Sequence, residues 1–598
     1  MNREVYEKNI KAYKQRYKKE YESIDNNKYE NKLEDTKDGN KTIQLETGDK
    51  KLYLHSKYSP IKEAERYYKD FKVKYGTLVI CFGFSLSYYI DELAKKINRT
   101  DDIIVYESDK ELFDIVMKNI DISHIISNED IKIIFNLNDI KMGLLGRPVD
   151  KKIEIAPIYE KIYEKEIIEF LKQVKNSIDT DLISVNTKES FKTEWVRNDF
   201  GNIDSILNSY NIYDFKDIFK DKPIVVVGAG PSLNKNVHLL KEIEGKVCII
   251  CAFSAAKVLE KQGINPNFLV TVDSKQYGLE EYEANIPLLY IKEAGKELLK
   301  NHKSEKLFCL NIDAVFLINI LDLEEKISFI PMSGTVASFA AGTARHFGAS
   351  EIILIGQDFS WTKEKAHADG TVHKKTKRYK IYHNHNMEEK DIYGNTVYTN
   401  KPFYKFKLWF DEFTANLPDN VKMIQATEGG LPIEGAETIT FREAIDKYCI
   451  DKYCDVNKIL NEAYKNNKLI GEEINKEKVY EDIRLVYEEL KDTKKLIEEA
   501  VLLSKKITKN IKYSTSGLKK NNNLIDRLNK IDQILKDNIK IKALMTTYSN
   551  DIYTYYTIEE TDDEKLNFAI MNEKLYTEMD KILDNIIKIA KEEMEYED

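Results

Sequence analysis

The chain has 598 residues, with 92 Lys and Arg against 101 Asp and Glu, so its formal net charge is −9. A chain of this length is too long for one hydrophobic core and is expected to form about three or four domains. The charge balance excludes the overall basic character that is typical of nucleic-acid-binding proteins.

The sequence gives no sign of export or of membrane insertion. Residues 1–21 are charged throughout and lack an apolar core, which excludes a secretory signal. No run of about 18 apolar residues occurs, so no transmembrane helix is expected. The six cysteines form no disulfide framework, and Cys248 and Cys251 share a predicted strand on which they would not converge on a metal. We therefore expect a cytoplasmic protein without a metal site.

Residues 1–150 are expected to form a Rossmann-like domain. The first 50 residues are polar and predict a short helix and a loop, and TLVICFGFSLSYYIDELAKKI then predicts a strand, a turn at Gly83 and a helix. A second strand ends at Glu107. Either Glu107 binds a ribose in a nucleoside site, or the domain is a degenerate Rossmann fold kept as a scaffold. We favour the scaffold, because Gly83 is the one glycine at the turn and Phe84 crowds it.

Residues 151–222 have mainly helical patterns and connect this domain to residues 223–445, where apolar strands alternate with helices. The alternation predicts a doubly wound, mostly parallel α/β sheet with helices on both faces. The expected strands are VVVG, VCIICAF, FLVTVD, PLLYI, LFCL, ISFIP, IILIG and VKMIQ.

Residues 446–598 are expected to form a helical bundle, because three apolar stripes with helical spacing replace the strands. Such a bundle serves either homo-oligomerisation or the holding of a protein partner, and the sequence leaves both open. The stripes are Ile483, Val486, Leu490, Ile497 and Val501; Leu524, Leu528, Ile531 and Leu535; and Leu575, Met579, Ile582, Ile586 and Ile589.

The most informative stretch is PIVVVGAGPSL, residues 223–233. Its apolar run predicts a buried strand. Gly228 and Gly230 would let backbone N–H groups approach a phosphate at the start of the next helix. The pattern differs from the common dinucleotide fingerprint, because Pro231 and Ser232 replace the third glycine. The turn therefore predicts a nucleotide or phosphate site.

Four further strand ends carry small or polar residues, and doubly wound sheets bind ligands at the carboxyl ends of their strands. Each residue has a structural alternative, such as an N-cap for Ser333 or backbone hydrogen bonding for Asp358. Their joint placement nevertheless favours one site. The residues are Asp273 and Ser274; Ser333, Gly334 and Thr335; Gln357 and Asp358; and Thr427, Glu428 and Gly429.

A polar stretch from Trp361 to Phe403 interrupts the α/β alternation and contains four of the nine histidines. A zinc site is one interpretation, because His383 and His385 have a ligand spacing found on strands, but no further ligands complete it. A long insertion at a strand's carboxyl end is more often a lid. Basic residues of this lid would attract a phosphorylated or carboxylated substrate: Lys374, Lys375, Lys377 and Arg378.

Taken together, these segments resemble the motility accessory factor (Maf) family of flagellin glycosyltransferases. The resemblance covers about residues 50–445 and rests on GAGPSL, TVDS, SGTVASFA, LIGQDFSWTKEKAHADG, DIYGNTVYT and ATEGGLPIEGA. The central block is also similar to the bacterial metal-independent sialyltransferases. The resemblance implies transfer of a nonulosonic acid, of the pseudaminic or legionaminic type, from its CMP donor to Ser or Thr of flagellin. No cofactor is implied, and the modification would serve flagellum assembly and motility.

In that reaction, we expect four groups of residues to bind the donor. The N–H groups of the glycine turn would hold the nucleotide phosphate, and the helix start would hold the sugar carboxylate. Two tyrosines would donate to the leaving phosphate, and in-line attack would invert the anomeric centre. The groups are Gly228, Gly230, Ser232 and Leu233 for the phosphate; Asp273 and Ser274 for ribose or base; Ser333, Gly334 and Thr335 for the carboxylate; and Tyr393 and Tyr398 for the leaving group.

The catalytic base is open. The sialyltransferases use a His in a lid segment with Tyr and Gly, and the comparable stretch here, DIYGNTVYT, contains none. Asp391, His367 and Glu428 are the candidates for taking the acceptor proton, a step typically worth about 10²–10⁴ in rate.

Two other functions are open. GAGPSL and TVDS also resemble the hydroxymethylpterin diphosphokinase family, which would imply an ATP-using pyrophosphoryl transferase. That reaction uses Mg²⁺ held by clustered carboxylates, and TVDS offers one acid. The remaining alternative is a flagellin-binding chaperone without catalysis, which the missing His favours.

Overall fold

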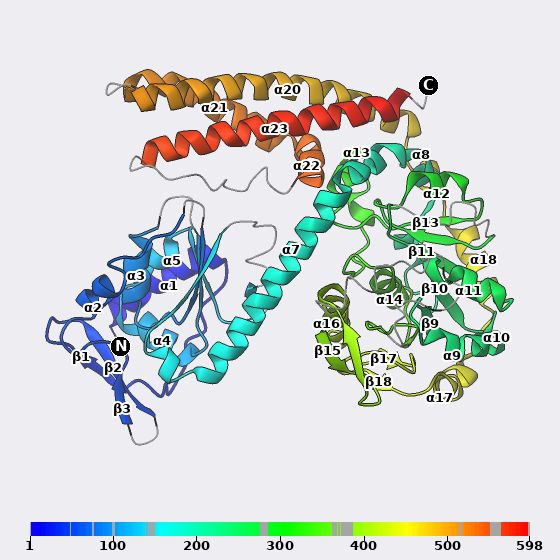
Figure 1. The fold of residues 1–598 in the computed structure, drawn as a ribbon, viewed down its shortest axis with the longest axis horizontal. Helices are drawn as coiled ribbons and strands as arrows, with labels where there is room; N and C mark the ends of the chain where they lie inside the picture. The colour runs from blue at the N-terminus through cyan, green and yellow to red at the C-terminus, as the bar shows by residue number, and fades with distance from the viewer. Residues whose placement is uncertain are drawn as a thin grey trace. The chain divides into compact units, whose positions relative to one another are not determined.

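The computed structural model describes residues 2–47, 50–74, 77–97, 102–137, 139–140, 150–274, 285–361, 368, 371, 387–513, 517–549 and 564–595. The chain forms two compact units (Figure 1). The first comprises residues 1–187, 496–531 and 549–581, and the second comprises 188–495, 532–548 and 582–598. Four long helices contribute to both: α7 (Glu164–Gly201), α20 (Lys476–Tyr513), α21 (Gly517–Asp537) and α23 (Glu564–Glu595).

The first unit is built on a four-stranded parallel sheet in the order β6-β5-β4-β7. β4 (Leu78–Phe82) lies between two neighbours, and every one of its residues is buried, as its unbroken apolar run predicts. The other strands are β5 (Asp102–Tyr106), β6 (Ile131–Ile134) and β7 (Lys151–Ile155). The helices are α1 (Arg3–Tyr17), α2 (Pro60–Tyr67), α3 (Tyr88–Ala94), α4 (Lys110–Asn119) and α5 (Ser123–Ser127).

The first 53 residues contain more structure than the expected helix and loop. β1 (Leu33–Asp35), β2 (Lys41–Thr47) and β3 (Lys50–Tyr53) form an antiparallel sheet. The expectation of a loop was wrong because these strands are largely polar and only Ile43 and Leu45 supply buried apolar side chains. Such a short alternation gives little periodic signal.

The second unit contains a nine-stranded sheet in the order β18-β17-β14-β9-β10-β11-β12-β13-β8, and its strands pair in parallel. The chain runs outward from β9 to β13 and then crosses to β14, on the other side of β9. The strand order therefore reverses between β9 and β14, where doubly wound sheets bind ligands. The strands are β8 (Tyr210–Asn211), β9 (Pro223–Val227), β10 (Cys248–Ala252), β11 (Phe268–Thr271), β12 (Leu288–Tyr290), β13 (Lys306–Phe308), β14 (Glu351–Ile355), β17 (Lys422–Gln425) and β18 (Glu437–Thr438).

Seven of the eight strands expected in residues 223–445 are present, and ISFIP is not a strand. The N–H of Ser328 donates to Leu310 O at 2.8 Å, beyond the end of β13. Pro331 then ends the segment without an N–H to donate. The expected connector, residues 151–222, also contributes strands at both ends, because β7 joins the first sheet and β8 joins the second.

Helix α14 (Val336–His346) packs across β9, β10, β11 and β14 (Figure 1). Just before β9, Asp217 N–H donates to His346 O (3.0 Å) and Phe219 N–H donates to Phe347 O (2.8 Å). The C-terminal end of α14 therefore lies at the edge of the sheet where β9 begins. Its first residues consequently lie toward the carboxyl ends of the strands.

Shorter helices complete the second unit, and some are only one turn long. They are α8 (Ile203–Leu207), α9 (Leu233–Asn236), α10 (Leu240–Ile243), α11 (Ala256–Lys261), α12 (Lys296–Asn301), α13 (Val315–Leu321), α16 (Lys401–Ala415), α17 (Phe441–Ala444), α18 (Val456–Asn466) and α19 (Ile470–Glu473). α22 (Ile539–Tyr548) packs against α13 within this unit.

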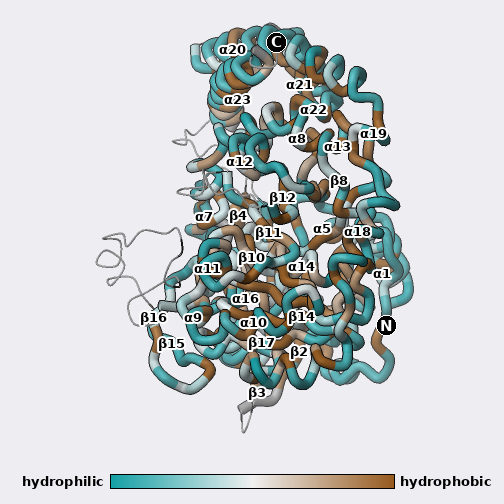
Figure 2. The backbone as a smooth tube through the Cα atoms, turned by 90° about the vertical axis from the view of Figure 1, so that its right-hand side faces the viewer, coloured by the Kyte–Doolittle hydropathy of each residue, from teal (hydrophilic) through white to brown (hydrophobic). Residues whose placement is uncertain are grey.

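The long C-terminal helices carry the apolar stripes that the spacing predicted. Ile497, Ile531 and Ile586 are fully buried, and both hydrophobic and hydrophilic residues occur in α20 and α23, as the brown and teal colours near their labels in Figure 2 show. Arg527 of α21 pairs with Glu499 of α20 at 2.6 Å. No helix within the described ranges is both long and apolar enough to cross a membrane.

Candidate functional site

The turn after β9 packs directly against the turn after β14. The N–H groups of Gly228 and Gly230 each donate to a carbonyl at the end of β14, at 2.8 Å. A Cβ on Gly228 would lie 1.8 Å from Gln357 Nε2, and a Cβ on Gly230 would lie 2.5 Å from Asp358 Oδ1. Both glycines are therefore required by the close approach of two chain segments.

Asp358 joins the two turns through its side chain and is almost fully buried. Its Oδ2 accepts the N–H of Ser232 at 2.9 Å, and the Ser232 hydroxyl donates to Oδ1. Burial raises the pKa of Asp358 to about 6, and the hydrogen bonds from Ser232 oppose that rise. Its carbonyl also accepts the N–H of Leu431 at 2.9 Å. One residue therefore fixes three segments of the site.

The structure corrects how the turn was expected to bind phosphate. Besides the two glycine N–H groups, Ser232 N–H donates to Asp358, and Leu233 N–H donates to Gly230 O at 3.1 Å. Pro231 has no N–H. The following helix, α9, is only four residues long, so its dipole is short. All four N–H groups expected to bind phosphate therefore donate to protein acceptors in this structure.

The loop after β17 brings Glu428 to the same edge. Thr427 is buried, and its hydroxyl donates to Leu354 O at 3.4 Å. Glu428 is half-buried and has a left-handed φ of +57°, which costs a non-glycine residue roughly 1–2 kcal/mol. Its Oε1 accepts from Asn236 Nδ2 at 3.3 Å and from Phe441 N–H at 3.2 Å. A strained acid at a sheet's carboxyl edge is typical of a functional site.

Lys235, which the sequence analysis did not single out, lies among these segments. Its Nζ donates to Glu428 O at 2.6 Å and lies 5.9 Å from the centre of the Tyr393 ring. A Cβ on Gly429 would lie 3.4 Å from Ser232 Cβ and 4.0 Å from Lys235 Nζ. The sequence feature that could have pointed to Lys235 is its position, two residues after the PSL segment of the glycine turn.

A hairpin of β15 (Met387–Lys390) and β16 (Thr396–Thr399) borders the site. Within its turn, Ile392 N–H donates to Gly430 O at 3.0 Å. Asp391 Oδ1 accepts the N–H groups of Tyr393 (2.9 Å) and Asn395 (2.8 Å), and Oδ2 accepts the Asn395 side chain at 3.2 Å. Asp391 therefore stabilises the turn, and this structural role is enough to explain an Asp at this position without a role in catalysis.

Of the other residues predicted in the lid, Tyr393 and Tyr398 belong to the described part of the chain and the histidines and basic residues do not. Tyr393 is 60% exposed beside Lys235, whereas the Tyr398 hydroxyl donates to Glu388 across the hairpin at 3.3 Å. His367 lies outside the described residues, as do His383, His385 and the basic residues 374–378. In the part of the chain that the structure describes, no three His, Cys, Asp or Glu side chains form a group that could hold a metal ion.

Asp273 and Ser274 follow β11, two strands away from β9 at the same edge. Asp273 is exposed, and its carbonyl accepts the N–H of Gly295 at 3.1 Å. A Cβ on Gly295 would lie 2.6 Å from Ser274 O. The segment beyond β12 therefore packs closely against the two residues predicted to hold ribose or base.

Ser333, Gly334 and Thr335 precede α14 at the carboxyl edge. The Thr335 hydroxyl accepts Ser338 N–H at 3.2 Å, and Ser338 Oγ accepts the N–H groups of Ser333 (3.0 Å) and Thr335 (3.3 Å). Ser338 thus shapes the turn, which the sequence analysis missed. Ser333 Oγ is buried and has no hydrogen-bond partner among the described residues, so a polar atom at this edge is left for a ligand.

The glycine turn of the first unit is filled by protein side chains. Gly83 has a φ of +97°, and a Cβ there would lie 2.7 Å from the Tyr159 ring. Glu107 is fully buried, and its Oε2 accepts Phe84 N–H (2.8 Å) and the Tyr159 hydroxyl (2.6 Å). Burial raises the pKa of Glu107 to about 7. These contacts favour the scaffold interpretation of the N-terminal domain.

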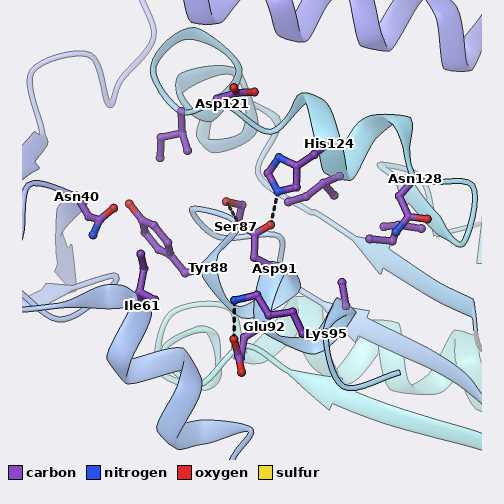
Figure 3. A pocket seen from close by; sticks show the side chains of 14 residues that line it. Asn40, Ile61, Ser87, Tyr88, Asp91, Glu92, Lys95, Asp121, His124 and Asn128 are labelled. Carbon is purple, nitrogen blue, oxygen red and sulfur yellow. Dashed lines mark hydrogen bonds and ion pairs between the residues drawn. The ribbon is translucent and has the colours of Figure 1, made fainter. Parts of the chain in front are cut away.

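A pocket of about 520 Å³ lies elsewhere in the first unit (Figure 3). Its polar side chains already have partners: Asp91 accepts from Ser87 Oγ (3.1 Å) and lies 2.6 Å from His124 Nε2, and Lys95 pairs with Glu92 at 2.9 Å. None of the site residues predicted from the sequence lines this pocket.

Comparison with known proteins gives partial matches to a pterin enzyme family and a match along the whole chain to a glycosyltransferase structure. Residues 197–364 match the family described as 6-hydroxymethylpterin diphosphokinase MptE-like. The 6-hydroxymethyl-7,8-dihydropterin pyrophosphokinase of Methanocaldococcus jannaschii is 28% identical over 157 residues, which are 25% of this chain and 65% of that relative. The chain therefore spans just under two thirds of that relative's length.

The structure of the MAf glycosyltransferase from Magnetospirillum magneticum AMB-1 matches over 100% of both chains, with a TM-score of 0.63 and 14% sequence identity. The chain therefore has the fold of that glycosyltransferase. The predicted α/β fold class, with a Rossmann-like N-terminal domain, a doubly wound central domain and C-terminal helices, is confirmed, and at the level of fold so is the resemblance to Maf proteins.

Proposed function

We propose that this protein is an inverting glycosyltransferase that moves a nonulosonic acid, of the pseudaminic or legionaminic type, from its CMP donor to Ser or Thr of flagellin in the cytoplasm. One observation carries the proposal. The likeness to the Magnetospirillum glycosyltransferase extends over the whole chain, including the first unit and the C-terminal helices, whereas the pterin enzyme matches only 25% of it. The proposed acceptor and sugar come from the resemblance in the motifs.

The donor is proposed to lie along the carboxyl edge of the large sheet, over the strands from β11 to β14. Asp273 and Ser274 would hold the ribose or base. The turn at Ser333, Gly334 and Thr335 would bind the sugar carboxylate, and the buried, unpartnered Ser333 Oγ supports that role within the described residues. The floor between these positions is the glycine turn packed against Gln357 and Asp358.

Glu428 is the proposed catalytic base. Asp391 uses both carboxylate oxygens within the hairpin turn, whereas Glu428 lies half-buried in a strained conformation beside the glycine turn. As the acceptor oxygen bonds to the anomeric carbon, its proton passes to Glu428. The bond from the anomeric carbon to the CMP oxygen breaks, and its electron pair leaves with CMP.

A second function is supported by the match of residues 197–364 to the pterin diphosphokinase-like family. It would transfer a pyrophosphoryl group from ATP to a hydroxymethylpterin, with release of AMP. That reaction gives no role to the first unit or to the C-terminal helices, which lie outside the match. It is therefore the weaker proposal.

The test is the intact mass of flagellin co-expressed with this protein and a CMP-nonulosonate pathway. We expect the mass to rise in steps of one nonulosonic acid, and not to rise when this chain is omitted. No rise, with flagellin still bound to the protein, would contradict transfer and favour the chaperone. Release of AMP from ATP and 6-hydroxymethyl-7,8-dihydropterin by the purified protein would favour the second function.

A further inference from the structure

We infer that Lys235 is the cation that holds the phosphate of the nucleotide donor, an assignment that rests on the proposed function. The glycine turn cannot supply that contact through the N–H groups first expected to do so. Those of Gly228, Gly230, Ser232 and Leu233 all donate to protein acceptors. The Ser232 hydroxyl is likewise used, because it donates to Asp358. A phosphate over this turn would therefore gain most from a side-chain donor beside it.

Lys235 is placed to be that donor. It follows the turn by two residues, is exposed, and lies between three segments of the site: the turn after β9, the loop after β17 and the tip of the hairpin. Its ammonium has three N–H donors. Glu428 O takes one of them at 2.6 Å. Among the described residues Lys235 makes no second hydrogen bond, so two of its donors remain available to a ligand.

The charges around Lys235 leave its own charge available to an anion. Within the described ranges it forms no ion pair, although two acids lie close by. Asp358 is bonded to Ser232, and Glu428 Oε1 accepts from Asn236 and Phe441. Among the described residues, the Lys235 ammonium donates one hydrogen bond, to the backbone carbonyl of Glu428, and its charge acts at longer range to lower the pKa of Asp358. A lysine in this setting is a point charge suited to phosphate.

The hairpin can add a neutral donor to the same anion. The Tyr393 ring centre lies 5.9 Å from Lys235 Nζ, and the adjacent Ile392 N–H is bonded to Gly430. The hairpin tip is thus fixed beside the ammonium. When the bond from the anomeric carbon to CMP breaks, negative charge grows on the phosphate, and a preplaced cation and hydroxyl stabilise it most at that moment.

Calorimetric titration of the full-length chain with CMP, cytidine and ATP tests this assignment. Lys235→Met should weaken CMP binding by about tenfold or more, because a charge-assisted contact is lost, and should leave cytidine binding unchanged. Lys235→Arg should retain most of the affinity. Lys241→Met is the matched control, since Lys241 pairs with Glu244 at 2.6 Å away from the site. Lys235→Gln repeats the test if the Met variant does not fold.

The outcomes distinguish an error in the role assigned to Lys235 from an error in the proposed CMP donor. Equal affinity of wild type and Lys235→Met for CMP would overturn the role of Lys235 and leave the CMP donor in place. Binding of ATP but not CMP, lost in Lys235→Met, would overturn the donor and keep Lys235 as the phosphate ligand. Binding of none of the three probes by the wild type would overturn both.

Discussion

Asp358 and Glu428 are two acids at one sheet edge whose surroundings give them different tasks. Asp358 is buried and accepts two hydrogen bonds from Ser232, so it holds the glycine turn in place. Glu428 is half-buried and strained, and only its Oε1 has recorded partners among the described residues. Environment of this kind commonly separates a structural carboxylate from a reacting one.

Replacing Asp358 with Ala should lower the free energy of unfolding of the second unit by about 2–4 kcal/mol, because two buried donors of Ser232 lose their acceptor. Asp358→Asn keeps an acceptor and should cost less. Urea unfolding followed by tryptophan fluorescence measures the effect, since Trp195, Trp361 and Trp409 all belong to the second unit. An Ala variant as stable as wild type would show that the turn does not depend on Asp358.

Glu428→Gln should reduce sugar transfer by about 10²–10⁴ with little change in unfolding, because a proton acceptor is lost and the shape is kept. Glu388→Gln, on the hairpin, is the control and should transfer normally. Single-turnover rates with purified flagellin give the comparison. Full activity of Glu428→Gln would move the base to His367 or Asp391.

At the scale of elements, local sequence patterns predicted most strands of the central domain, because burial of an apolar run depends on neighbouring residues. The run Ile224–Val227 identified β9 because an unbroken apolar strand has to be buried on both faces. The partner of its turn could not be predicted, since Gly228 meets Gln357 far along the chain and no periodicity encodes that contact. ISFIP was wrongly predicted as a strand because its apolar residues outweighed Pro331, which cannot donate a hydrogen bond to a neighbouring strand. Strands β1 to β3 were not predicted because they are largely polar and show little alternation of apolar and polar residues.

The hairpin gives a prediction at this scale. Asp391→Ala should increase hydrogen exchange of residues 391–395, because the turn loses the acceptor for two N–H groups, while unfolding of the second unit changes by less than about 1 kcal/mol. Transfer should fall far less than in Glu428→Gln. Exchange measured by mass spectrometry tests the local effect. A loss of transfer as large as that of Glu428→Gln, with unchanged exchange, would make Asp391 the base.

At the scale of the whole molecule, the order of domains was predictable and the division into units was not. Helical spacing indicated the apolar stripes of the C-terminal helices. It could not indicate that helices such as α7 and α20 contribute residues to both compact units. The first unit also contains no tryptophan, because all three lie in the second. Tryptophan fluorescence and far-ultraviolet dichroism should therefore report different parts of an unfolding curve.

The first unit should lose stability as pH rises. Glu107 has a folded pKa of about 7, above its ordinary value of 4.5. Between those values the folded state holds a proton that the unfolded chain has released, so the free energy of unfolding falls by about 2–3 kcal/mol from pH 5 to pH 8. Calorimetry of wild type and Glu107→Gln should show the slope and its reduction in the variant. The same slope in both proteins would contradict the assignment to Glu107.

The glycines of GAGPSL are held by neighbouring backbone and side chains, and this has a consequence for ancestry. Selection for folding alone would preserve them in a lineage that had given up the reaction, because any side chain at Gly228 or Gly230 would collide with the turn after β14. The presence of the GAGPSL motif in a related sequence therefore indicates that the fold is retained, and it does not by itself indicate that the protein is active. Positions 235 and 428, where no close backbone approach restricts the choice of side chain, are where the loss of chemistry would first become visible.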